Sequence, residues 1–262
     1  MLNHEKGIGC KFGVLLFIAA LFLQLNPLNA NHILGGEIQY TAQGNNKYRF
    51  KVRVYRNCNE CEFNSGSCAN ITELEILLPP EVNKTPTVLG KIPITRISRR
   101  DVTPMCAIQK SSCAGGSFNA GIEEWCFEGD FDFTALLKNN CQFEISLKVD
   151  SRLDAWNLGA GEAFYNFTRL NICESSANSS PDFKEPGFFL LPFNQSFTHQ
   201  ITVNDPDGDS ISWELVSAQK GFNRDITYGT GFSYQKPLSV NCTGPGCPFF
   251  PRLWPVDRKS VV

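Results

Sequence analysis

The stretch Lys47-Tyr48-Arg49-Phe50-Lys51-Val52-Arg53-Val54-Tyr55 alternates basic and apolar side chains, and it decides the fold. Period-two alternation predicts a β-strand with one face on a core and the other in water. Gly44-Asn45-Asn46 precedes it, and both residue types tolerate positive φ, so we expect a hairpin turn there. The partner strand of this hairpin is predicted over residues 36–41.

The same alternation recurs along the chain at intervals of about ten residues, with turn signals between the runs. Strands are predicted over residues 73–78, 125–127, 131–133, 142–150 and 165–172. Glu128-Gly129-Asp130 is interpreted as a turn, and residues 132–139 as one short helix or turn. The predicted class is all-β, with two β-sandwich domains of the immunoglobulin or cadherin kind in tandem, the second truncated.

Composition shifts divide the chain into four parts. Residues 1–30 carry two lysines, an apolar run and a small-residue cleavage site, and they predict a signal peptide; the alternative is an uncleaved membrane anchor. The first domain is expected over 31–177 and the incomplete second over 178–256. Residues 257–262 back-translate to a common sequencing adapter, which predicts an artefact; the alternative is a genuine polar tail. No stable transmembrane segment is expected in the mature chain.

The net charge is −2 and the chain contains 11 cysteines. A weakly acidic chain has no global basic field, so no nucleic-acid partner is expected. The basic face of residues 47–55 is therefore interpreted as a solvated sheet face. So many cysteines are typical of an oxidising compartment, which predicts a secreted or outer-surface location.

Ten cysteines remain after the predicted cleavage, and all are candidates for disulfide bonds. Local pairs are expected for Cys106 with Cys113, Cys126 with Cys141, and Cys242 with Cys247. Two more bonds would come from Cys58, Cys61, Cys68 and Cys173. Zinc binding or redox chemistry at Cys58 and Cys61 is the alternative interpretation.

In the second domain, a strand ending at Val203 is expected to lead through an acidic turn into a strand over residues 211–215. The turn contains Asp205, Asp207 and Asp209. Carboxylates at this density suit Ca²⁺, so a calcium site is one interpretation and a plain hairpin turn is the other.

No motif of a hydrolase, nucleotide-binding or zinc enzyme occurs, and the chain is predicted not to be an enzyme. A hydrolase with an unmarked carboxylate pair stays open, with Glu123 and Glu124 as candidates that nothing singles out. A carbohydrate-binding module is the other alternative. Trp156 is its best candidate for stacking on a sugar ring, since it falls in a predicted loop, whereas Trp125 is expected in the core.

Several short motifs occur in an order that resembles large secreted proteins of gliding, Bacteroidetes-type bacteria. They are the segments 31–40, 44–50, 54–58, 178–183, 204–213 and 228–233. The resemblance implies cadherin- or PKD-like modules of a type IX secreted surface protein with a gliding motility-associated C-terminal domain. It implies a structural or adhesive role, with surface polysaccharide or other surface proteins as partners, and the aspartates of the acidic turn as calcium ligands. The adjacent cysteine pair that is common in that family is missing between residues 147 and 152.

Overall fold

The computed structural model describes residues 33–60, 62–65, 69–105, 108–117, 121–150, 152, 155, 157–159, 162–188, 202–212 and 214–237. Nearly all regular structure within these ranges is β-strand, which confirms the predicted all-β class. The strands are β1 (Ile33–Gly44), β2 (Lys47–Asn57), β3 (Glu73–Leu77), β4 (Val88–Pro93), β5 (Thr95–Asp101), β6 (Ile122–Asp132), β7 (Gln142–Val149), β8 (Phe164–Asn171), β9 (Asp182–Phe183), β10 (Val203–Asn204), β11 (Gln219–Gly221) and β12 (Arg224–Asp225). The two short 3₁₀ helices are Ser112–Ala114 and Phe133–Ala135.

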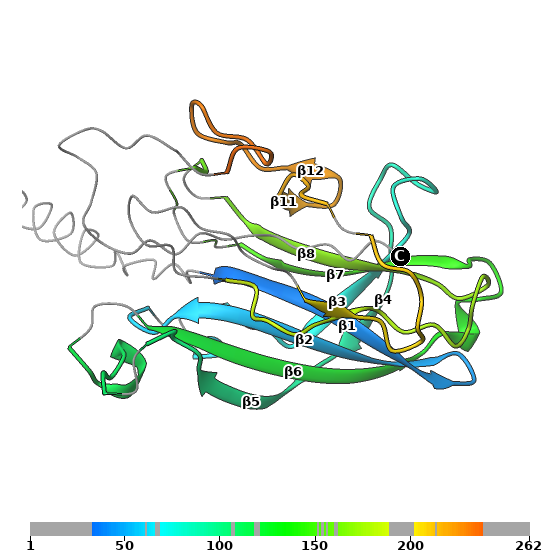
Figure 1. Ribbon diagram of the computed structural model, residues 1–262. Helices are drawn as coiled ribbons and strands as arrows, with labels where there is room; N and C mark the ends of the chain where they lie inside the picture. The colour runs from blue at the N-terminus through cyan, green and yellow to red at the C-terminus, as the bar shows by residue number, and fades with distance from the viewer. Residues whose placement is uncertain are drawn as a thin grey trace, which may run out of the picture.

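The strands form two main antiparallel sheets that pack face to face (Figure 1). One sheet has the order β1-β2-β6-β5, and the other has the order β12-β11-β8-β7-β3-β4. Strands β9 and β10 pair in a small separate sheet. The chain changes sheets between β4 and β5, which are separated by the single buried residue Ile94.

The core lies between the two main sheets and is built by the alternation that the sequence shows. Every second residue of β2 and β7 is buried in one shared apolar cluster, namely Tyr48, Phe50, Val52 and Val54 from β2 with Phe143, Ile145, Leu147 and Val149 from β7. Phe133 adds an aromatic bridge, since its ring lies 5.0 Å from that of Phe143 and 5.8 Å from that of Tyr48. Burying such side chains is the main favourable contribution to folding.

The hairpin that joins β1 to β2 confirms the predicted turn. Gly44 pairs with Lys47, and Asn45 and Asn46 form the loop. Gly44, Asn45 and Asn46 all have positive φ, at 78°, 53° and 60°. Tight hairpin loops require this backbone, which explains why glycine and asparagine stand here.

The predicted turn at Glu128-Gly129-Asp130 is wrong, because β6 runs through it without a break. Gly129 is required by packing and does not form a turn. A Cβ atom at this position would lie 2.2 Å from the carbonyl oxygen of Pro93, the last residue of β4. The glycine therefore permits a close approach of two backbones.

Basic residues on the water-facing side of β2 are paired across the sheet. Arg49 stands opposite Asp130 and forms a bidentate pair with it at 2.8 and 3.0 Å. Arg53 is paired with the buried carboxylate of Glu37. The alternating positive charge is thus neutralised by acidic neighbours on adjoining strands, in agreement with a structural sheet face.

The described part of residues 178–237 packs on these sheets. Ser180 Oγ accepts a hydrogen bond from the Tyr40 amide at 2.9 Å, and the Ser180 amide donates to the Tyr40 carbonyl, so this segment covers the edge of β1. Strand β11 joins β8 through the pair Gln219 and Tyr165. The domain boundary near residue 177 stays a prediction. The strand expected over 211–215 is wrong for its described residues beyond a single bridge at Ser212, since Ile211 and Leu215 are 36% and 46% exposed.

Candidate functional site

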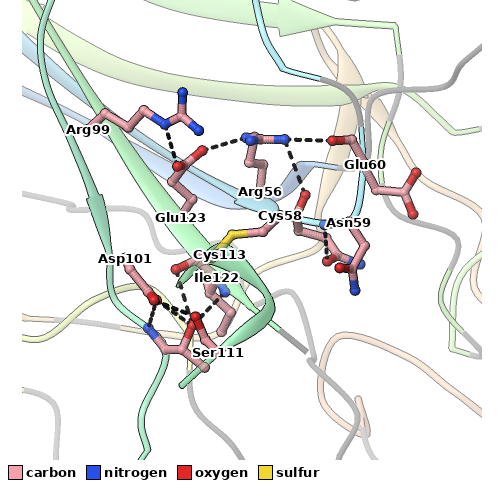
Figure 2. Close-up of a disulfide and its surroundings, with 12 residues drawn as sticks. Arg56, Cys58, Asn59, Glu60, Arg99, Asp101, Ser111, Cys113, Ile122 and Glu123 are labelled. Atoms are coloured by element: carbon pink, nitrogen blue, oxygen red, sulfur yellow. Dashed lines mark hydrogen bonds and ion pairs between the residues drawn. A yellow bond between two sulfur atoms is a disulfide. The ribbon is translucent and has the colours of Figure 1, made fainter. Parts of the chain in front are cut away.

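The densest group of interacting charged side chains in the described part of the chain lies at one end of the four-stranded sheet (Figure 2). Here β2 ends, β5 ends and β6 begins, and antiparallel pairing brings the three strands into register. Glu123 of β6 stands opposite Arg56 of β2 on one side and opposite Asp101 of β5 on the other. Strand pairing alone therefore delivers these charged residues to one place.

Glu123 is the centre of this group, and both of its carboxylate oxygens are occupied. Oε2 accepts hydrogen bonds from Arg56 Nε at 2.7 Å and from Trp125 Nε1 at 2.6 Å. Oε1 accepts from Arg99 Nε. Burial raises the pKa of Glu123, but the hydrogen bonds from Trp125, Arg99 and Arg56 outweigh it and hold the pKa below its ordinary value. The carboxylate is therefore charged at neutral pH.

Trp125 supplies the apolar wall against which the arginines lie. Its side chain is fully buried, as expected from the sequence. The guanidinium groups of Arg96, Arg99 and Arg56 lie 4.4, 5.4 and 5.7 Å from the indole ring centroid. Such distances are those of cation–π attraction. Phe63 meets the same ring edge-on at 5.3 Å between centroids.

A disulfide bond between Cys58 and Cys113 lies beside this cluster (Figure 2). It joins the turn after β2 to the short helix in the loop between β5 and β6. Asp101 reinforces the same end, since it accepts hydrogen bonds from Ser111 Oγ and from Thr103 Oγ1. Burial raises the pKa of Asp101, but these bonds outweigh it and leave the pKa below its ordinary value.

The two carboxylates considered as a hydrolytic pair are held apart by the strand. Glu123 and Glu124 are neighbours in β6, so their side chains leave opposite faces of the sheet. Glu124 accepts two hydrogen bonds from Arg100, at 2.7 and 3.1 Å, while Glu123 is held by Arg56 and Arg99. The arrangement anchors the edge strand β5 through ion pairs; it does not place two carboxyl groups across a common space.

The aspartates of the acidic turn are engaged in local hydrogen bonds. Asp205 Oδ1 accepts from the amides of Asp207 and Asp209, at 2.9 and 3.2 Å. Asp207 Oδ2 accepts from the Ser179 amide at 2.6 Å, which ties the turn to the segment along β1. Within the described ranges, no group of three or more histidine, cysteine, aspartate or glutamate side chains is placed to hold a metal ion. The calcium site stays a prediction.

The cysteine pairs differ from the local pairs expected from the sequence. Cys113 is bonded to Cys58 and not to Cys106, and Cys141 is bonded to Cys173 and not to Cys126. Cys126 is a buried free thiol in the middle of β6. The reason is topological: Cys141 precedes β7 and Cys173 follows β8, so the antiparallel pairing of these strands brings the two thiols together. Nearness in sequence is a poor guide when strands reverse direction.

The other residues singled out from the sequence lie outside the described residues. They are Trp156, Cys61, Cys68, Cys106, Cys242 and Cys247. Sequence reasoning also missed the arginine cluster around Trp125. The only signal in the sequence was a pair of oppositely charged segments. One is Arg99-Arg100-Asp101, which lies in a stretch without apolar alternation, and the other is Glu123-Glu124.

Comparisons with protein-family models, curated proteins and solved structures find no match for this chain. Among the described residues, no helix has the length and apolar character needed to cross a membrane.

Proposed function

We propose that this chain is an extracellular, non-enzymatic module with a structural and adhesive role. The observation that carries the proposal is the Cys58–Cys113 disulfide beside the buried Arg56–Glu123 pair. Disulfide bonds form and persist in oxidising compartments, and this one supports a location outside the cytoplasm. Together with the predicted signal peptide, it supports export of the chain.

Cross-links at the ends of a sandwich suit a module that transmits force between two partners. Cys58–Cys113 closes one loop, and Cys141–Cys173 joins the start of β7 to the end of β8. The resemblance to Bacteroidetes-type surface proteins points the same way, toward surface polysaccharide or other surface proteins as partners. Type IX export and membership of that family are part of the proposal.

The proposal predicts that the chain attaches to a surface without cleaving the molecules of that surface. Beads that carry the full chain are placed under flow on surfaces coated with bacterial envelope polysaccharide or with envelope protein. We expect attachment that survives washing, with no release of soluble sugars or peptides. Beads that carry reduced and alkylated chain are the control, and they should detach.

Two outcomes would contradict the proposal. One is the steady release of sugar or peptide products, since it would make the chain an enzyme. The other is equal retention of native and reduced chain on every surface, because it would show that the disulfide-bonded fold contributes nothing to attachment.

A further inference from the structure

A shallow pocket lies beside β11 and β12, which belong to the six-stranded sheet, whereas the strands of the arginine cluster belong to the four-stranded sheet. Its volume is about 620 Å³, which is within the range of small-ligand sites. The extended segment before β11, residue Asp225 of β12 and the tip of a following turn form its walls. The lining residues are Glu214, Leu215, Val216, Ser217, Asp225, Tyr234 and Gln235.

The turn that carries Tyr234 and Gln235 is fixed by hydrogen bonds. The Ser233 amide donates to the Lys236 carbonyl at 3.2 Å, and the Lys236 amide donates back to the Ser233 carbonyl at 3.1 Å. Tyr234 and Gln235 therefore stand at the tip of a closed two-residue loop. The backbone of the loop is already ordered, so a ligand that contacts it need not order this backbone on binding.

The whole loop is anchored at both ends by the buried residue Asn157. Its carbonyl accepts from the Gly229 amide at 3.0 Å, and its side-chain nitrogen donates to the Pro237 carbonyl at 3.0 Å. Residue Tyr228 adds a further tie, since its hydroxyl accepts from the Ala218 amide at 3.1 Å. Hydrogen bonds thus fix the loop that carries Tyr234 and Gln235 to the segments beside it; the loop is drawn in orange in Figure 1.

The residues that line the pocket are suited to bind an uncharged ligand with several hydroxyl groups. Tyr234 is 37% exposed and Leu215 is 46% exposed, so an apolar surface is available for the C–H face of a sugar ring. Around it lie hydrogen-bonding groups suited to the hydroxyl rim of a sugar, namely the carboxylates of Glu214 and Asp225 and the amide of Gln235. A charged acceptor binds a hydroxyl donor more strongly than a neutral one does.

The charge of the lining residues favours a ligand that is not anionic. Two of them, Glu214 and Asp225, are carboxylates, and no lysine or arginine is among them. An anionic ligand would be repelled by two carboxylates. We propose that this pocket binds one to two rings of a neutral oligosaccharide, with a ring against Tyr234 and hydroxyl groups donating to Glu214. Sugar binding at this pocket does not require the adhesive role proposed above, so the two proposals are tested independently.

The test uses the full chain in solution and calorimetric titration with neutral hexasaccharides of glucose, mannose and galactose. We expect at least one of them to bind with a dissociation constant of about 1 mM or tighter. Tyr234→Ala should weaken that binding about tenfold, and Tyr234→Phe should retain most of it because the ring remains. Glu214→Gln should weaken it less, since the amide oxygen can still accept a hydrogen bond.

Glu73→Gln is the matched control, because it removes an exposed carboxylate on β3, three strands away from β11, and should leave binding unchanged. Circular dichroism checks that each variant is folded. The proposal is overturned if none of the hexasaccharides binds, or if binding is unaffected by Tyr234→Ala in the folded variant. Preferential binding of hexalysine would also overturn it and would assign the pocket to a basic peptide.

Discussion

At the scale of single residues, the molecule depends on charges that are buried in pairs. Arg56 is 3% exposed, and its partner Glu123 is nearly as well buried. Removing one member of a buried ion pair leaves the other without compensation, which costs far more than breaking an exposed pair. The cluster around Trp125 is therefore a site where a conservative substitution has a large effect.

Glu123→Gln should lower the free energy of unfolding by about 3 kcal/mol, because the buried Arg56 loses its nearest carboxylate. Chemical denaturation monitored by tryptophan fluorescence measures this. Glu73→Gln, which breaks the exposed pair with Lys91, is the control and should cause no measurable change. Equal losses of unfolding free energy for the two substitutions would show that the buried pair stabilises the fold no more than the exposed pair does.

The pKa of Glu123 also predicts an acid dependence. Because its folded pKa lies below the unfolded value of 4.5, the charged carboxylate stabilises the fold above that pH, and the contribution is lost as pH falls through the folded pKa. The difference in unfolding free energy between the native chain and Glu123→Gln should be constant from about pH 5 to 8 and shrink below about pH 4.5. Denaturation at several pH values measures it, and a difference that grows on acidification would contradict the assignment.

At the scale of elements, β6 is the strand that organises the four-stranded sheet. It pairs with β2 over eleven positions and with β5 on its other side. It packs closely against the backbone of Pro93, where the chain passes from β4 to β5, and this contact requires the small residue Gly129. The strand is therefore sensitive to added volume at Gly129.

Gly129→Ala should destabilise the fold by about 2 kcal/mol, because the new Cβ atom would overlap the Pro93 carbonyl oxygen. Gly90→Ala in β4 is the matched control. Its Cβ atom would meet Ile76 Cδ1 at 3.6 Å, an ordinary contact, so this change should be neutral or slightly stabilising. Thermal unfolding compares the two, and a stable Gly129→Ala variant would argue against the close approach.

The sequence predicted the elements that bury one face and missed those that do not. The alternation in β2 and β7 and the positive-φ residues at 44–46 were sufficient to locate a hairpin and both halves of the core. Strand β5 was missed because every one of its residues is exposed, so its sequence carries no alternation. Gly129 was misread because glycine marks both turns and close backbone approaches. The arginine cluster could not be predicted, since it depends on the pairing of three strands that are distant in sequence.

At the scale of the whole molecule, the Cys141–Cys173 disulfide connects two strands that pairing has already brought together. Cys141 and Cys173 are 32 residues apart and close a loop that contains β7 and β8. A cross-link over such a distance restricts the unfolded chain and stabilises the native state by an entropic effect. Cys126 makes no such contribution.

The double variant Cys141→Ser with Cys173→Ser should lose about 3–4 kcal/mol of unfolding free energy. Cys126→Ala should lose only about 1 kcal/mol, because it removes one buried sulfur atom and no cross-link. Urea denaturation under non-reducing conditions measures both losses. If the double variant is as stable as the native chain, the bond between these two cysteines is not formed.

The most direct test of the disulfide-bonded sandwich is peptide mapping of the chain by mass spectrometry without reduction. The account predicts linked peptides that contain Cys58 with Cys113 and Cys141 with Cys173, and a Cys126 thiol that is alkylated only after unfolding. A bond that involves Cys126, or a Cys141 linked to any other cysteine, would contradict both the pairing of β7 with β8 and the account built on it.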